Sequence, residues 1–154
     1  MPRDSGGGGG GGGTPYPGTN EVFALPNDPS RFSSTSFHMM GLGSALAITP
    51  KQTGNIRAII TADGGWTATT DGMNYQIAWG TGVAPSNGAA ATGTVVGKTK
   101  ALSIENANIS EAFTIIAVIT GLTLGTAIWI DLQVESQGGN LFYIKNVAAD
   151  IQEI

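Results

Sequence analysis

The chain lacks cysteine entirely and has a single histidine, His38, among its 154 residues. Without cysteine there is neither a disulfide nor a thiolate ligand, and one histidine cannot build the usual nitrogen and sulfur cage of a zinc site. His38 stands beside two methionines in SFHMMGLG, which is typical of a packed or interface residue. We therefore expect no metal, no cofactor and no catalytic group built on this histidine.

Charge is also scarce. Only 12% of the residues are charged, with 7 basic against 11 acidic side chains and a net charge of −4. Soluble domains usually carry about a quarter charged residues, so this deficit suggests that much of the surface is buried against partners. The densest basic pair is Lys98 and Lys100. Because a phosphate backbone needs several basic side chains on one face, we expect no nucleic-acid partner.

Catalytic signatures are missing as well. Asp63 and Asp71 lie in separate glycine-bearing loops, and Asp131 and Glu135 lie on one expected strand. A glycosidase needs two carboxylates about 5 to 10 Å apart with supporting residues, and no pattern brings such a pair together. GLGS and GTGVAPSNGAAATG lack the GKS or GKT ending of a phosphate-binding loop. We expect the chain not to be an enzyme.

Glycine and proline are concentrated at the N-terminus. Residues 6–13 are all glycine, and five of the seven prolines precede residue 36. Such a stretch disfavours a helix or a central strand. We interpret residues 1–36 as an extended arm, either a flexible tail or a segment held by a partner. Its candidate anchors are its large apolar side chains: Tyr16, Val22, Phe23, Leu25 and Phe32.

From residue 37 onward, short apolar runs alternate with turn-forming sequences such as TADGGW, TTDGM and SQGGN. Strand-length runs include NIRAIITA, MNYQIAWGTG, AFTIIAVIT, AIWIDLQVES and NLFYIKNV. Regular short strands at this spacing indicate an antiparallel sandwich or barrel. The sequence therefore predicts an all-β domain over residues 37–154, an antiparallel β-sandwich of jelly-roll type.

The uncharged run over residues 112–130 is almost long enough to cross a membrane. Its pattern nevertheless favours two strands. Residues 128–135 alternate between apolar and mostly polar positions, as in a half-buried strand, whereas residues 115–120 are largely apolar on both faces, as in a strand buried on both sides. Gly121 and Gly125 between them suit a chain reversal. We expect a strand, a turn and a strand, and no membrane span.

Aromatic residues give one candidate binding surface. Trp66 and Trp79, with the loop around Asn87, are possible glycan contacts, because exposed aromatic rings stack on sugars. The alternative, which we favour, is core packing of these rings with one ring exposed.

Four segments resemble a family of small β proteins encoded in tailed-bacteriophage genomes: MMGLGSALAITPKQTGNIRAIITA, YQIAWGTGVAPSNGAAATGTVVG, ITGLTLGTAIWIDLQVES and IKNVAADIQEI. The resemblance covers roughly residues 39–154 and excludes the arm. It implies a structural virion component, such as a decoration, head-fibre or tail-associated protein, assembled in the host bacterial cytoplasm. A receptor- or glycan-binding tip of a phage appendage is the alternative.

The strand order is also similar to that of trimeric jelly rolls of the tumour necrosis factor type, which implies a homotrimer. In that arrangement the N-terminal arm would bind other virion proteins.

Overall fold

The computed structural model describes residues 20–67, 71–104 and 106–154. Over these residues the chain is all-β and contains no helix. The strands are β1 (Glu21–Ala24), β2 (His38–Met39), β3 (Ala47–Ile48), β4 (Ile56–Trp66), β5 (Asp71–Thr81), β6 (Thr94–Ile104), β7 (Ser110–Ile119), β8 (Ile128–Ser136) and β9 (Phe142–Glu153).

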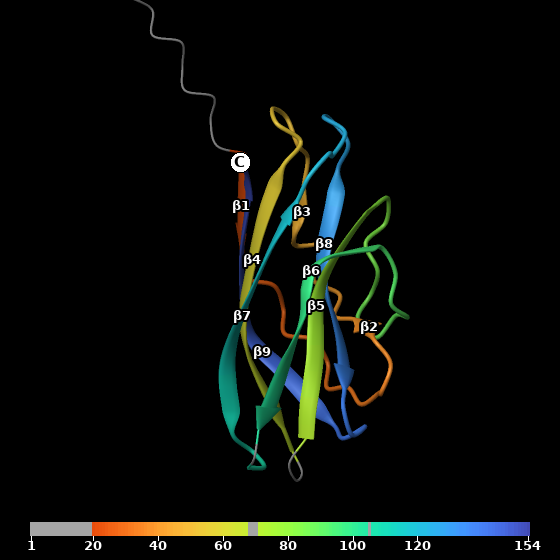
Figure 1. The fold of residues 1–154 in the computed structure, drawn as a ribbon, viewed down its shortest axis with the longest axis vertical. Coiled ribbons are helices and arrows are strands. Elements are labelled where there is room, and N and C mark those ends of the chain that lie inside the picture. The colour runs from red at the N-terminus through yellow and green to blue at the C-terminus, as the bar shows by residue number, and fades with distance from the viewer. Residues whose placement is uncertain (1–19, 68–70, 105) are drawn as a thin grey trace, which may run out of the picture.

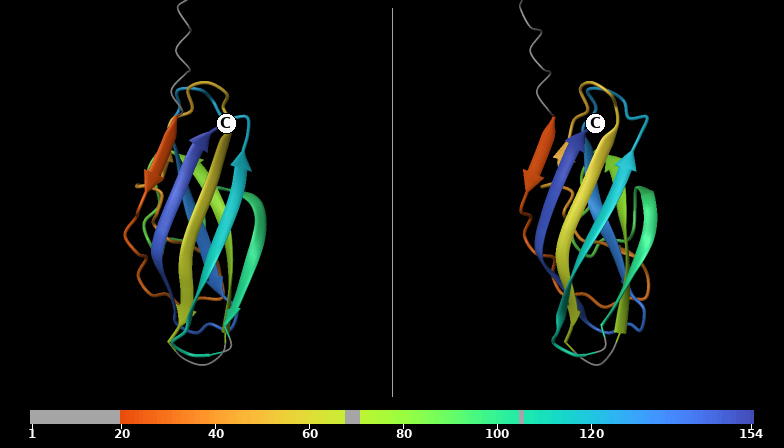
Figure 2. Two further views of the ribbon diagram at one scale, coloured as in Figure 1. Left: turned by 90° about the vertical axis from the view of Figure 1, so that its left-hand side faces the viewer. Right: turned by 60° about the vertical axis from the view of Figure 1, so that its left-hand side comes forward.

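The strands form two antiparallel sheets that pack face to face (Figure 1). Sheet A has the order β1-β9-β4-β7, and its four strands lie side by side in Figure 2. Sheet B has the order β2-β8-β5-β6, and β3 also pairs with β8. Because neighbours in each sheet come from distant parts of the chain, this is the crossed-over connectivity of a jelly roll. The predicted antiparallel sandwich is confirmed.

The core lies between the two sheets. Strand β4 shows the cause most plainly, since its side chains alternate between buried and half-buried positions from Ile56 to Thr61, as strand geometry requires. Both sheets supply aliphatic side chains that are at most 2% exposed: Ile56, Ile60, Ile115 and Ile119 from sheet A, and Met73, Ile77, Ile130, Leu132 and Val134 from sheet B.

The uncharged run over residues 112–130 forms β7, a turn and the start of β8, as predicted. Gly121 and Gly125 in the turn have φ angles of 73° and 78°, a left-handed conformation that glycine adopts without steric cost. Within the described part of the chain, no helix has the length and apolarity needed to cross a membrane.

The burial expected for these two strands is reversed. Strand β7 was predicted to be buried on both faces, but Ile116 is 57% exposed and Val118 is 45% exposed. Strand β8 was predicted to be half-buried, but Trp129, Asp131 and Gln133 are all at most 5% exposed. The reason is tertiary: β7 is an edge strand whose outer face is not covered by any of the described segments, whereas other segments cover the outer face of β8.

The cover over β8 comes from the segment after β2 and from the loop between β5 and β6, which lie together beside β2 in Figure 1. The Met39 amide donates to the Ala89 carbonyl at 2.9 Å, and the Gly88 amide donates to the Met39 carbonyl at 2.9 Å. Met39, Ala78 and Trp129 form a small second apolar cluster beneath this layer.

Residues 20–36, assigned from sequence to the arm, run along the sandwich. Strand β1 pairs with β9 from Glu21 opposite Gln152 to Ala24 opposite Ala149. Phe32 forms a bridge with Phe142, with backbone hydrogen bonds in both directions. A short edge strand is compatible with the prolines around it.

Candidate functional site

The candidate anchors of the arm do not behave alike. Val22 and Phe32 are partly buried against the core of their own chain. Phe23 is 71% exposed and Leu25 is 72% exposed. Tyr16 lies outside the described residues. Alternation along β1 explains the difference, because Val22 points toward the core while Phe23 points outward.

The three candidate glycan contacts do not form one surface. Trp66 is 1% exposed and belongs to the core, so its ring is not available to a sugar. It ends β4, beside the start of β5, whereas Trp79 is half-buried near the far end of β5. Asn87 is exposed but engaged, since its Nδ2 donates to the Met40 carbonyl at 3.2 Å. Core packing, the favoured alternative for the rings, describes Trp66.

The buried carboxylate of Asp131 organises the MMGLG segment. Asp131 is fully buried, and its oxygens accept hydrogen bonds from the amides of Gly41 at 3.0 Å and Leu42 at 3.0 Å. Burial raises the pKa of this carboxyl to about 6, although the backbone donors act in the opposite direction. Gly41 has a φ of 74°, and a Cβ there would lie 2.6 Å from the Asn87 nitrogen, so this tight approach requires glycine.

Glu153 performs a similar role at the end of β9. Its carboxylate accepts hydrogen bonds from the amides of Lys51 at 2.8 Å, Gln52 at 2.7 Å and Thr53 at 2.7 Å. The Asn20 Nδ2 donates to it at 2.9 Å. Burial alone would raise the pKa of Glu153, but these donors together outweigh it and hold the pKa well below its usual range.

Asp71 links the start of β5 to the turn between β8 and β9. It accepts hydrogen bonds from the Ser136 hydroxyl at 2.8 Å and from the amides of Gly138 at 2.7 Å and Asn140 at 3.1 Å. Asp63, the remaining acid considered for catalysis, accepts from the Asn146 Nδ2 at 2.6 Å. These acids therefore hold loops and strands together.

No group of three histidine or acidic side chains is arranged to hold a metal ion in residues 20–67, 71–104 and 106–154. The carboxylates described so far bind backbone amides or polar side chains of their own chain. The outer face of sheet A has a different character.

The outer face of sheet A carries exposed apolar side chains in cross-strand rows. One row runs Phe23, Asp150, Ile59 and Ile116 across β1, β9, β4 and β7. Val118 lies in the adjacent row, opposite Arg57. A hollow of about 160 Å³ at Phe23 and Ile59 is floored by small side chains of β4 and β9. Asp150 and Arg57 lie among these apolar side chains, so the face combines apolar and charged groups.

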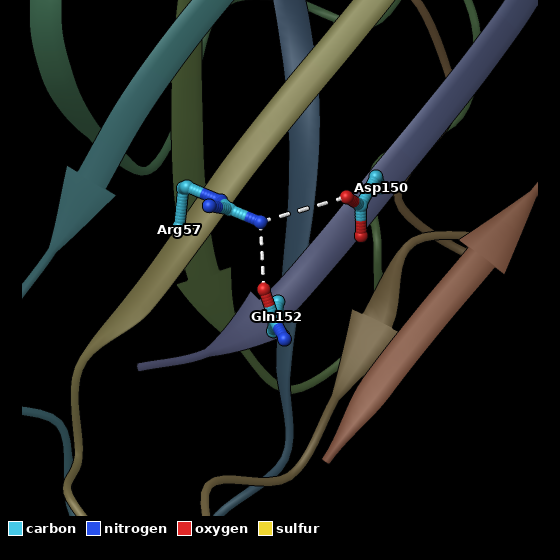
Figure 3. A network of polar contacts seen from close by, with 3 residues as sticks. All are labelled: Arg57, Asp150 and Gln152. Carbon is cyan, nitrogen blue, oxygen red and sulfur yellow. Dashed lines mark hydrogen bonds and ion pairs between the residues drawn. The ribbon is translucent and has the colours of Figure 1, made fainter. Parts of the chain in front are cut away.

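A polar network lies among these apolar side chains (Figure 3). One Nη of Arg57 on β4 donates to the Gln152 Oε1 at 2.6 Å and lies 3.7 Å from the Asp150 Oδ2 on β9. The Arg57 Nε and the Asp150 Oδ1 are inaccessible to solvent and have no hydrogen-bond partner. Buried polar atoms are normally paired, so this network has unused hydrogen-bonding capacity.

Sequence reasoning did not identify this face. The apolar pairs of β7 were visible in the sequence, but they indicated a strand buried on both sides. Only the sheet order, which puts β7 at an edge with none of the described segments over it, shows that Ile116 and Val118 are exposed.

No protein-family model matches the chain, and no curated protein has a matching sequence. The fold, however, has a counterpart among solved structures. The structure of Eiger TNF from S. frugiperda superposes with a TM-score of 0.53 at 9% sequence identity, covering 88% of this chain and 92% of that one. The protein is therefore a jelly-roll β-sandwich with a tumour necrosis factor-like fold.

Proposed function

We propose that the protein is a structural component of a bacteriophage particle, a self-associating homotrimer that displays its β-sandwich. Its Gly/Pro-rich N-terminal segment attaches it to other virion proteins as a decoration, head-fibre or tail-associated protein. The phage assignment is supported by the sequence resemblance over residues 39–154. The self-association is supported by the outer face of sheet A, which is the observation that carries this proposal.

Apolar burial supplies the driving force for association. Ile116, Val118 and Phe23 are 57%, 45% and 71% exposed, and each Å² of apolar surface removed from water contributes about 25 cal/mol. The face is built on paired strands of a sheet, so little conformational freedom is lost when it is covered. The tumour necrosis factor-like fold makes a three-fold arrangement the natural one to test.

The Arg57 network adds specificity to such an interface. The unpaired Arg57 Nε and Asp150 Oδ1 are desolvated already in the single chain. The Arg57 and Asp150 side chains are otherwise 38% and 33% exposed, so a second copy would form charge-assisted hydrogen bonds with their accessible atoms. A polar pair within an apolar face also disfavours incorrect registers.

The test is solution mass by light scattering. The full chain should have a mass about three times that of the 15.7 kDa monomer. The substitutions Ile116→Glu and Val118→Glu should each produce monomers, because a buried unpaired carboxylate opposes association by several kcal/mol. Val83→Glu is the matched control, since Val83 is 95% exposed in the loop after β5.

A monomeric full chain, or monomers from Val83→Glu as readily as from Ile116→Glu, would refute self-association through sheet A. The virion assignment needs its own experiment. Antibodies against residues 20–154 should label intact phage particles in negative-stain micrographs of a lysate. Label confined to soluble material after the particles have been purified would refute it.

The positions of the chain ends suit display of the sandwich on a particle. The start of β1 and the C-terminus lie at the same end of the molecule (Figure 1), and Glu21 pairs with Gln152 there. Attachment through the N-terminal segment would therefore leave the opposite end of the sandwich directed away from the particle.

A further inference from the structure

A second surface feature lies toward the end of the sandwich that is remote from residue 20. It is a hollow of about 220 Å³ between the segment after β1 and the first residues of β9. Its walls are formed by Asp28, Pro29, Arg31, Tyr143, Ile144 and Lys145. Pockets for drug-sized ligands measure about 300–1,000 Å³, so this hollow has room for one small chemical group.

Two cations converge on one aromatic ring in this hollow. The Lys145 Nζ lies 4.8 Å from the centroid of Tyr143, and the Arg31 guanidinium carbon lies 5.9 Å from the same centroid. Within the described ranges, neither has a carboxylate within 4.0 Å, since the salt bridge found there joins Arg57 and Asp150. Both cations therefore line the hollow without a salt bridge to a described carboxylate.

The ring between the cations is held in place. The Tyr143 hydroxyl is 3.1 Å from the Ser110 hydroxyl and donates to the Ile109 carbonyl at 3.4 Å. A side chain at Gly65, which pairs with Tyr143 across β4 and β9, would collide with the tyrosine. Glycine at this position leaves the space that the ring occupies.

This convergence is unusual for the chain. The protein has only 7 basic residues and a net charge of −4, and like charges held close together repel each other. Contacts with Tyr143 offset part of that repulsion. A bound anion would remove the rest, and it would receive charge-assisted hydrogen bonds from both side chains.

Asp28 restricts which anion fits. Among the residues that the structure describes, its Oδ1 accepts one long hydrogen bond, from the Val147 amide at 3.5 Å, which leaves acceptor capacity on this wall. A carboxylate in the wall repels a dianion such as phosphate, but it accepts hydrogen bonds from hydroxyl groups. The hollow therefore combines two cations, one hydroxyl acceptor and the apolar ring of Pro29.

We propose that this hollow binds an acidic sugar, namely a hexuronate residue of a polysaccharide. The carboxylate of the sugar accepts hydrogen bonds from Arg31 and Lys145, its hydroxyls donate to Asp28, and the apolar face of its ring contacts Pro29. This site goes beyond the proposed structural role and uses none of the side chains that we assign to self-association.

Ligand-observed NMR titration of the full-length protein tests the site, with D-glucuronate as the probe. D-glucose lacks the carboxylate, acetate lacks the hydroxyls, and inorganic phosphate is a polyanion; these are the comparison ligands. Glucuronate should bind at least about tenfold more tightly than glucose and acetate, as expected for loss of a charge-assisted hydrogen bond. It should also bind more tightly than phosphate.

Substitutions then assign the contacts. Arg31→Gln and Lys145→Gln should each weaken glucuronate binding about tenfold. Lys98→Gln is the matched control, because it removes the same charge from an exposed position on β6. Asp28→Ala should reduce the preference for glucuronate over acetate about tenfold while leaving acetate binding intact or stronger. Thermal unfolding of each variant verifies that it is folded.

The proposal would be overturned if glucuronate did not bind detectably or if glucose bound equally well. It would also be overturned if Lys98→Gln weakened glucuronate binding as much as Lys145→Gln did. Phosphate binding as tight as that of glucuronate, with the same dependence on Arg31 and Lys145, would overturn it too. A monomeric protein that binds glucuronate would refute the trimer and leave this site standing, so the two proposals fail separately.

Discussion

Single carboxylates hold the long loops of this protein onto its sheets. Asp131 joins the glycine-rich segment after β2 to β8, and Glu153 joins the loop before β4 to the end of β9. In both cases the partners are backbone amides that the sheets leave unpaired. Burial raises the pKa of both carboxyls and hydrogen-bond donors lower it. Burial has the larger effect at Asp131 and the donors have the larger effect at Glu153, so the two pKa values shift in opposite directions.

The pKa of Asp131 is about 6 in the folded chain, whereas an unburied aspartate has a pKa of 3.8. This difference sets the direction in which stability changes with pH. The folded state favours the protonated carboxyl, so stability attributable to this group is present below pH 4 and is lost as the pH rises through 6. In Asp131→Asn this dependence is removed. The free energy of unfolding of the wild type, relative to the variant, should fall by about 2–3 kcal/mol between pH 4 and pH 7.

Urea denaturation of both proteins at each pH measures this difference, and the comparison cancels groups that titrate in both. Glu111→Gln provides the control, since Glu111 is exposed on β7. A wild type that shows no such fall relative to Asp131→Asn, or the same fall relative to Glu111→Gln, would contradict the assignment.

Glu153 should behave in the opposite way. Its pKa is lowered, so its stabilising contribution is present above its usual pKa of 4.5 and is lost as the pH falls below that value. Glu153→Gln replaces an acceptor oxygen with an NH₂ group that faces backbone donors. We expect the Tm at pH 7 to drop by several degrees and the gap to the wild type to narrow below pH 4, as measured by circular dichroism. A gap that is independent of pH would argue against a charged role.

At the scale of elements, β7 and β8 show what periodicity does and does not determine. Both were predicted as strands, and both are strands, because their β-branched residues and flanking turns act locally. Their burial depends on neighbours instead. Strand β8 is covered on its outer face by segments that are distant in the chain, and β7 ends sheet A without such a cover.

A pair of alanine substitutions measures this contrast. Trp129→Ala should destabilise the fold by about 3–5 kcal/mol, because Trp129 is 5% exposed and its removal leaves a cavity beneath the loop after β5. Ile116→Ala should cost under about 0.5 kcal/mol, because Ile116 is 57% exposed in the single chain. Both are measured by urea denaturation in the Val118→Glu background, where self-association does not contribute. Equal costs would mean that β7 is covered within one chain.

At the scale of the whole molecule, the boundary between arm and domain matters. Sequence composition separates residues 1–36 from 37–154, yet residues 20–36 supply β1 and the bridge of Phe32 to Phe142. Composition reports the density of glycine and proline, whereas pairing is decided by the edge that β9 offers. A strand of four residues, Glu21–Ala24, is too short to be recognised by periodicity among prolines.

Two truncations test this placement. A chain that begins at Asn20 should match the full chain in its denaturation midpoint. A chain that begins at Phe37 should be less stable by about 2 kcal/mol or more, because it loses the burial of Val22 and Phe32. It should also aggregate more readily, because the edge of β9 becomes unpaired. Identical midpoints and identical scattering for the two chains would place the domain boundary at residue 37.

Some expectations about candidate sites came from composition, whereas others depended on the fold. The composition argued against metal, cofactor and nucleic-acid chemistry before any fold was known, and these remain expectations. Core packing was the favoured interpretation for Trp66 on general grounds, but no local pattern decided it, because a ring at the end of a strand lies on the surface or in the core depending on which sheet packs over it. The pairing of Arg31 with Lys145 at Tyr143 joins residues more than a hundred positions apart, and no local pattern indicates it.

By itself, the sequence determined that this chain is all-β, where most of its strands lie, and that residues 112–130 form two strands joined by a turn. Those properties depend on backbone propensities and on the spacing of apolar side chains, which act between near neighbours. Only the tertiary structure decided which faces are exposed, how β1 joins sheet A and which charges meet at the hollow. Those outcomes depend on contacts between distant segments, and their energies come from burial and pairing that exist only once both sheets have formed.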